Sequence, residues 1–165
     1  MALPRKKLLV VSMVLTVVLA SLATLLALMR NAAMYDANTQ MKYLMVALHQ
    51  YASEYGDGHL PPQNGHRGLL ALYSLGILGQ NDTSLLLDPR KWPRGSWSEL
   101  PESDVAYWYV GGHSLGESRD CIVLVQKKRG AWGYVGYLDG RILYESGERW
   151  ATIRSSTVEA GQEHR

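Results

Sequence analysis

Histidine has the most versatile chemistry of the side chains in this sequence, because imidazole can act as a general base or as a metal ligand. Four of the five histidines fall in three places: His49 in a predicted helix, His59 and His66 in one loop, and His113 in another. A zinc site needs three or four ligands at characteristic spacing, such as an HExxH motif or paired cysteines. Neither pattern occurs here. We interpret the loop histidines as surface residues and expect no metal site.

The oxygen-bearing side chains do not indicate a reaction centre either. Asp57, Asp82 and Asp88 offer oxygen ligands for Ca²⁺, but their spacing differs from that of an EF-hand loop. Ser114 and Ser118 lack the GxSxG context of a nucleophilic serine. The glycine pairs fit neither a P-loop nor a dinucleotide-binding fingerprint. The sequence therefore predicts no enzyme activity and no cofactor.

The single cysteine, Cys121, stands in the apolar run 121–125, and we expect it to be a small buried hydrophobic residue. One cysteine cannot form an intramolecular disulfide. This excludes the small disulfide-stapled scaffolds.

A charge-free run, residues 8–29, lies between Arg5-Lys6-Lys7 and Arg30. At about 1.5 Å per residue, a helix over this run is roughly 33 Å long, which is enough to cross a hydrocarbon core of about 30 Å. We expect residues 1–30 to form a cytoplasmic basic flank and a transmembrane helix. The basic residues before the run predict a cytoplasmic N-terminus and an exported C-terminal part.

A cleavable signal peptide is the alternative interpretation of this run, with Ser21-Leu22-Ala23 as the cleavage site. The apolar sequence continues past that site through Leu25, Leu26 and Leu28, which favours an uncleaved anchor.

The charge of the part after the run argues against nucleic-acid binding. Four of the 17 basic residues flank the run, so 13 remain against 15 acidic residues. A domain with this balance lacks the basic surface that binds nucleic acid.

The helix is expected to continue beyond the apolar run, because residues 31–55 contain neither Pro nor Gly. Apolar side chains recur there at steps of three and four residues, which is typical of an amphipathic helix. This stripe consists of Met34, Ala37, Met41, Leu44, Met45, Leu48, Tyr51 and Tyr55. Gly56 is placed to end the helix.

The rest of the chain predicts a short helix over 68–75, a loop over 88–103, and then strands. Four segments rich in β-branched and aromatic residues, 105–110, 121–126, 132–138 and 141–145, are separated by turn signals. Asp139-Gly140 is typical of a type I′ hairpin turn. Short connections predict an antiparallel meander, and the segment 151–165 is expected to be a disordered tail.

Aromatic residues suggest a contact surface. Trp92 and Trp97 fall in the proline-rich loop, and Trp108 faces away from Tyr107 and Tyr109 in the first strand. We expect Trp108 either to pack within the domain or to contact another subunit or a glycan.

Small residues line one face of the charge-free run: Ser12, Thr16, Ala20, Ala23 and Ala27. Such residues allow membrane helices to approach closely. This face is a candidate for contact with another transmembrane helix.

A long half-apolar helix followed by a small antiparallel sheet resembles a type IV pilin or a type II secretion pseudopilin. The stretch MKYLMVALHQYASEYGDGHLPP at 41–62 is similar to pilin-like proteins of the planctomycete and verrucomicrobial kind, in which "YA-x-x-Y" leads into a "G-x-x-P" loop. Residues 134–142 resemble their closing "F-x-D-G-x-V" hairpin. The usual prepilin peptidase motif is lacking, and the apolar run contains no Glu. The resemblance implies a pilin-derived domain that stays in the inner membrane.

Together these observations predict an α+β fold, with a long N-terminal helix packed on a β-meander of about four strands. The expected domains are residues 1–30 and an exported domain over 31–150. The expected function is that of a non-enzymatic pseudopilin-like protein of the bacterial envelope. Its partners would be the lipid bilayer and its own or other pilin-like helices. A membrane-anchored periplasmic ligand-binding or sensory domain is the alternative.

Overall fold

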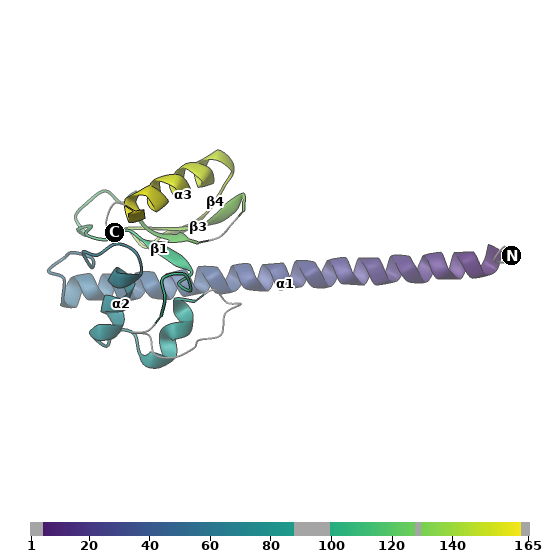
Figure 1. Cartoon of the computed structure of the whole chain (residues 1–165), viewed down its shortest axis with the longest axis horizontal. Coiled ribbons are helices and arrows are strands. Elements are labelled where there is room, and N and C mark those ends of the chain that lie inside the picture. Colours follow the sequence, from purple (N-terminus) through teal and green to yellow (C-terminus); the bar gives the residue numbers. More distant parts are fainter. Residues whose placement is uncertain (1–4, 88–99, 128–129, 163–165) are drawn as a thin grey trace. The chain divides into compact units, whose positions relative to one another are not determined.

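The computed structural model describes the backbone of residues 5–87, 100–127 and 130–162, without the side chains at 5–14, 26–36, 80, 81, 83 and 159–162. The fold is α+β (Figure 1). In chain order the elements are α1 (Arg5–Glu54), α2 (His66–Ser74), the 3₁₀ helix η1 (Gln80–Leu85), β1 (Tyr107–Tyr109), β2 (Ile122–Gln126), β3 (Trp132–Tyr137), β4 (Ile142–Ser146) and α3 (Gly147–Gln162).

The chain divides within α1 into two compact units, Met1–Asp36 and Ala37–Arg165. The sequence had placed this boundary after residue 30. In the first unit, the described side chains at 15–25 are all exposed. Among the residues that the structure describes, no helix is long and apolar enough to cross a membrane.

The four strands form one antiparallel sheet in the order β1-β2-β3-β4, as the sequence predicted. The turn between β3 and β4 differs in detail from the prediction. A type I′ turn needs positive φ at both central residues, but of Asp139 and Gly140 only Gly140 has one, at 86°. The Gly140 N–H donates to the Tyr137 carbonyl at 2.9 Å, so the loop is wider than two residues.

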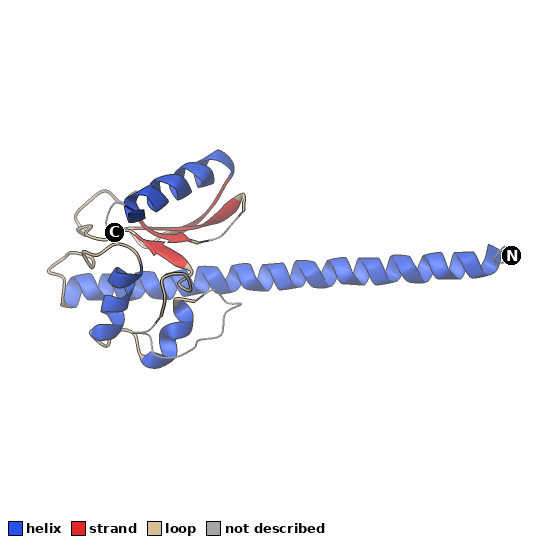
Figure 2. Ribbon diagram, viewed as in Figure 1, coloured by secondary structure: helices blue, strands red, loops and turns tan. Residues whose placement is uncertain are grey.

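One face of the sheet packs on residues 41–52 of α1 and on α2 (Figure 2). The predicted stripe forms this contact: Met41, Leu44 and Leu48 are completely buried. The stripe ends earlier than predicted, because Tyr55 is 52% exposed and α1 ends at Glu54. The first residue with positive φ after the helix is Asp57 rather than Gly56.

The other face of the sheet is covered by α3, which the sequence analysis did not anticipate (Figure 2). The expectation of a disordered tail from residue 151 differs from the structure, where the helix continues to Gln162. Trp150, Ile153 and Thr157 are buried, and their spacing of three and four residues places them on one face of a helix. The sequence shows no clear apolar periodicity in this segment, because only a few apolar residues of the helix face the sheet.

Candidate functional site

The connection between β1 and β2 is held against the loop that follows α1. The Leu60 N–H donates to the His113 carbonyl at 2.8 Å, and the Leu115 N–H donates to the Gly58 carbonyl at 2.8 Å. His59 and Ser114 form an isolated antiparallel bridge between the two segments. These backbone bonds fix the start of the connection, where His113 lies.

Two tight turns then follow, and they fold the connection back toward β2. The Glu117 N–H donates to the Ser114 carbonyl at 3.0 Å, and the Cys121 N–H donates to the Ser118 carbonyl at 3.1 Å. The end of the connection is held by the Leu138 N–H, which donates to the Cys121 carbonyl at 2.8 Å. His113, Glu117 and Cys121 are thereby brought together.

The side chains of these three residues form a cluster with one nitrogen, one oxygen and one sulfur atom. His113 Nδ1 lies 2.8 Å from Glu117 Oε2, and Cys121 Sγ lies 3.8 Å from the same oxygen. The three ligand atoms all lie within 4.8 Å of one another. His113 and Cys121 are half-buried, and Glu117 is exposed. We call His113, Glu117 and Cys121 the loop cluster.

The environment shifts the pKa values of two members of the loop cluster. The pKa of Glu117 is lowered, first by the hydrogen bond that Oε1 accepts from the Ser114 N–H and then by the hydrogen bond with His113. The pKa of the Cys121 thiol is raised, first by burial and then by the charge of Glu117. A carboxylate beside a thiol and an imidazole can therefore accept hydrogen bonds, and the same atoms can bind a cation.

Sequence reasoning missed the loop cluster. It treated His113 as a surface residue, Cys121 as a buried hydrophobic residue, and Glu117 not at all. The pattern His-x₃-Glu-x₃-Cys at 113–121 was the available signal. It was not recognised because it is neither an HExxH motif nor a pair of cysteines, and the three residues come together only through the two turns of the folded connection.

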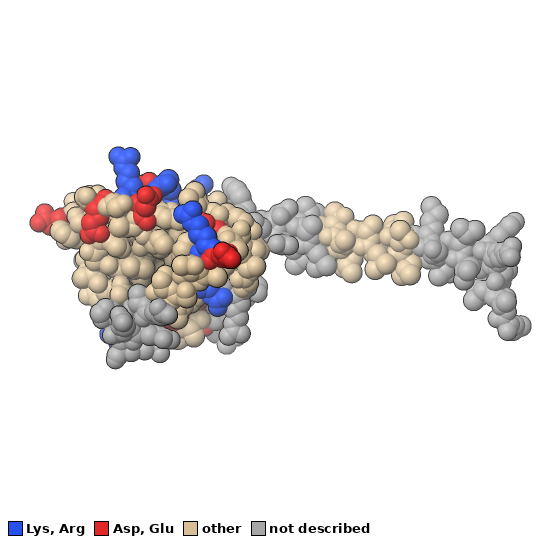
Figure 3. Space-filling view, turned by 90° about the horizontal axis from the view of Figure 1, so that it is seen from above, with Lys and Arg blue, Asp and Glu red and all other residues tan. Residues whose placement is uncertain are grey.

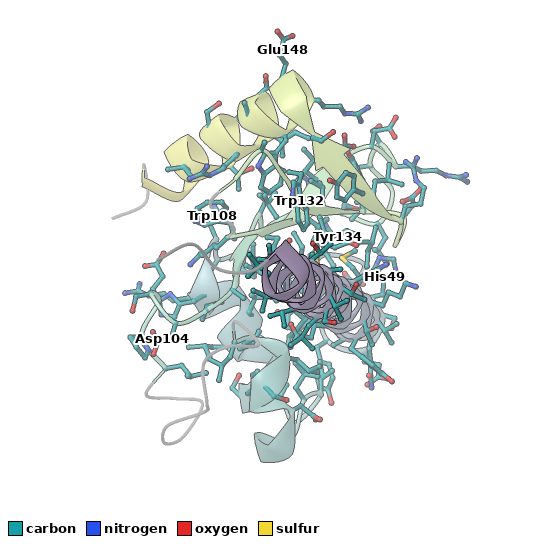
Figure 4. The ribbon with its side chains drawn as sticks, turned by 90° about the vertical axis from the view of Figure 1, so that its right-hand side faces the viewer. His49, Asp104, Trp108, Trp132, Tyr134 and Glu148 are labelled. Atoms are coloured by element: carbon teal, nitrogen blue, oxygen red, sulfur yellow. The ribbon has the colours of Figure 1, made fainter. Side chains whose placement is uncertain are left out.

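A second cluster, of aromatic side chains, lies on β3 and β4. The rings of Trp132 and Tyr144 stack with centroids 5.2 Å apart, and Tyr134 meets Tyr144 edge-on at 6.0 Å. Tyr134 and Tyr144 are direct cross-strand partners, and Tyr144 is 48% exposed. Figure 4 shows Tyr134 on the side of the sheet toward α1. The alternation of aromatic residues along 132–134 was the signal for this surface.

Trp108, which the sequence analysis had proposed as a contact residue, has a different environment. It is half-buried and packs against the cluster formed by the sheet and α3, beneath that helix in Figure 4. Packing within the domain was one of the two interpretations left open, and the structure favours it. Trp92 and Trp97 lie outside the described residues.

The small residues predicted on one face of the apolar run are described only in part. The side chains of Thr16, Ala20 and Ala23 are exposed, and those of Ser12 and Ala27 lie outside the described set. The Thr24 hydroxyl donates to the Ala20 carbonyl at 2.9 Å.

Comparison of the chain with family models, with curated proteins and with solved structures returned no match. The resemblance to pilins therefore stays a prediction from the sequence.

Proposed function

We propose that this chain is a membrane-anchored, pilin-like structural protein of the bacterial envelope, without enzyme activity. In this proposal, the first half of α1 spans the inner membrane with its N-terminus in the cytoplasm. The domain that follows is exported and serves in a secretion or pilus-like assembly. One observation carries the proposal: the described part of the first unit is a helix with apolar side chains exposed on every side.

The exposed side chains are large and follow one another closely. Six of them are between 52% and 59% exposed: Leu15, Val17, Val18, Leu19, Leu22 and Leu25. Successive helix positions are about 100° apart, so three consecutive residues, 17–19, already point to three sides. A helix that is hydrophobic all round belongs in a protein core or in a membrane. In the sequence, the same charge-free run extends over 8–29.

The charge distribution agrees with this division of the chain. In the space-filling view, the described side chains of the first unit, at 15–25, are neither basic nor acidic, whereas the second unit carries both kinds of charge on its surface (Figure 3). A helix without charges is suited to lipid, and a surface of mixed charges is suited to water.

The continuity of α1 supports the pilin-like part of the proposal. One helix, Arg5–Glu54, runs through the division between the two units, and its second part is the central element of the second unit's core. A helix with an apolar first part, and a second part that buries an apolar stripe, is the arrangement expected of the pilin-like proteins that the sequence resembles.

The anchor is tested by placing charges in the run and fractionating cells. We expect the full chain to stay with membranes after alkaline carbonate washing. The double variant Val18→Glu with Leu22→Glu should move to the soluble fraction or be degraded, since each charge at the helix centre costs about 2.5–3.5 kcal/mol. The matched control, Tyr43→Glu with Val46→Glu, alters positions that are 60% and 67% exposed on the second part of the same helix. It should stay with membranes.

The outcome that contradicts an anchor is equally specific. A mature chain that begins near Thr24, found by N-terminal sequencing, would identify the run as a cleaved signal peptide. Protease added to spheroplasts should digest the domain, and protection of the domain would contradict export.

Assembly through the membrane helix is tested separately. Ala20→Leu with Ala23→Leu enlarges the small-residue face, and we expect it to reduce in-cell crosslinking between subunits or partners. The control Val18→Leu with Ser21→Leu adds bulk away from that face and should leave crosslinking unchanged. Equal crosslinking in both double variants would remove this face from the proposal and favour a ligand-binding or sensory domain.

A further inference from the structure

We infer that the loop cluster, His113, Glu117 and Cys121, binds a divalent cation of the zinc class. The inference rests on the second unit alone and does not depend on whether the chain is membrane-anchored. Three ligand atoms of different chemistry converge there within 4.8 Å of one another.

Two of the three distances in the cluster differ by no more than about 0.6 Å from those that a tetrahedral zinc ion requires. Bond lengths of about 2.0–2.3 Å give ligand separations of about 3.4 Å between nitrogen and oxygen and about 3.6 Å between sulfur and oxygen. The corresponding separations are 2.8 Å for His113 Nδ1 to Glu117 Oε2 and 3.8 Å for Cys121 Sγ to Glu117 Oε2. Small side-chain rotations would therefore let the ion replace the two hydrogen bonds.

A hydrogen bond outside the cluster orients the carboxylate ligand. Glu117 Oε1 accepts the Ser114 N–H at 2.9 Å, while Oε2 faces His113 and Cys121. The carboxylate can thus bind the ion through Oε2 and keep its bond to Ser114. Support of this kind fixes a ligand before the metal arrives and is typical of protein metal sites.

The main chain also holds the ligands in place. The His113 carbonyl is bonded to the Leu60 N–H, and the Cys121 carbonyl to the Leu138 N–H. Two ligands are therefore tied to different parts of the domain, and the third stands on the turns between them. The folded domain therefore already holds the ligands in place, and little conformational entropy is lost when the ion binds.

The donor set determines which cation fits. Imidazole nitrogen and thiolate sulfur favour zinc and related transition-metal ions, whereas Ca²⁺ and Mg²⁺ take six or more oxygen ligands. Three protein ligands leave the fourth tetrahedral position to water. On binding, the Cys121 thiol loses its proton to solvent and the sulfur–metal bond forms, so one proton is released from that group.

A bound ion would close the connection between β1 and β2. His113 follows β1 by four residues and Cys121 immediately precedes β2, so the ion would join the two ends of the loop. Because the ligands come together only in the folded domain, binding should also raise its melting temperature.

The test uses the full chain, solubilised in detergent and purified with an affinity tag that contains no histidine. Calorimetric titration with Zn²⁺ should give one ion per chain. Titration with Co²⁺ should give the near-ultraviolet charge-transfer band of a cobalt–thiolate bond. Cys121→Ser should abolish this band. Cys121→Ser, His113→Gln and Glu117→Gln should each weaken zinc binding at least about tenfold.

His59→Gln is the matched control. His59 is exposed, pairs with Ser114 in the same region, and lies outside the loop cluster. It should bind Zn²⁺ like the parent and show the same cobalt band. Near-ultraviolet circular dichroism without metal checks that each variant is folded. The inference is overturned if the parent binds less than one ion per chain, if the cobalt band survives in Cys121→Ser, or if His59→Gln loses affinity as strongly as His113→Gln.

Discussion

The contact between Trp150 and Gly133 should be the point at which α3 is most sensitive to substitution. Trp150 is 1% exposed, and its indole N–H donates to the Gly130 carbonyl at 3.0 Å. A Cβ atom built on Gly133 would lie 2.6 Å from Trp150 Cζ2 and 2.8 Å from Cζ3. The ring therefore lies directly on the glycine backbone of β3.

Two single substitutions should each destabilise the domain, for opposite reasons. Trp150→Ala removes a buried ring and leaves a cavity, which costs about 3–5 kcal/mol. Gly133→Ala adds a methyl group where the ring already lies, which costs about 1–3 kcal/mol through overpacking. Either cost is a measurable fraction of the free energy of unfolding of a whole domain, which is typically about 5–15 kcal/mol.

The double variant decides whether this contact is the cause. Once the ring is absent, the methyl group at residue 133 has space, and alanine is favoured over glycine in a strand by about 0.5–1 kcal/mol. In the Trp150→Ala background, Gly133→Ala should therefore cost nothing or be slightly stabilising. The expected coupling energy is about 2–3 kcal/mol.

Urea unfolding of the full chain in detergent, followed by near-ultraviolet circular dichroism, measures the four midpoints of this cycle. If Trp150→Ala does not fold, Trp150→Leu also removes the ring atoms above Gly133 and keeps the cycle measurable. Equal costs of Gly133→Ala in both backgrounds would show that the two residues do not touch, and would refute the proposed packing of α3.

Three further predictions concern other parts of the second unit. Leu48→Asp places an unpaired charge in the core and should lower the free energy of unfolding by several kcal/mol. Val46→Asp, at a position 67% exposed, should change it by no more than about 0.5 kcal/mol. Equal urea unfolding curves for the two variants would show that α1 does not face the sheet through Leu48. Tyr137→Phe removes the hydroxyl that donates to buried Glu145 at 3.0 Å and should cost about 1–3 kcal/mol, while Tyr144→Phe on the exposed neighbour should be nearly neutral in the same assay. The lowered pKa of Glu117 means that its ionised form is favoured in the folded state, so its stabilising contribution is present above pH 4.5 and is lost as the pH falls through its native pKa. The difference in urea midpoint between the parent and Glu117→Gln should therefore shrink on acidification without metal, and a constant difference from pH 6 to pH 3 would contradict this.

The sequence predicted the elements whose pattern is strong and local. The apolar stripe with Leu44 and Leu48 on α1, and the alternation and turn signals of the four strands, identify an antiparallel meander on an amphipathic helix. Both follow from periodicity alone, because each element must bury one face.

The sequence pattern did not predict contacts between distant segments of the chain. The helix α3 depends on Trp150 and Ile153, which are too few to stand out from a polar segment, and becomes recognisable only beside the sheet that they cover. The loop cluster depends on hydrogen bonds from Leu60 and Leu138, which lie far from His113 and Cys121 in the sequence. Spacing along the chain contains no information about such neighbours.

The buried carboxylate of Glu145 has a consequence for how the sheet meets other molecules. Its strand, β4, is at the end of the sheet order, so one side of its backbone has no neighbouring strand among the described residues. Open edges of this kind recruit strands from other chains, and natural proteins resist this with inward-pointing charged residues. Glu145 is held inward by Tyr137 and by Arg149, whose Nε lies 3.3 Å from Glu145 Oε2. A foreign strand that flattened or shifted β4 would have to break this pairing and leave a charge without its partner. The residue that orders the contact with α3 therefore also discourages edge-to-edge aggregation.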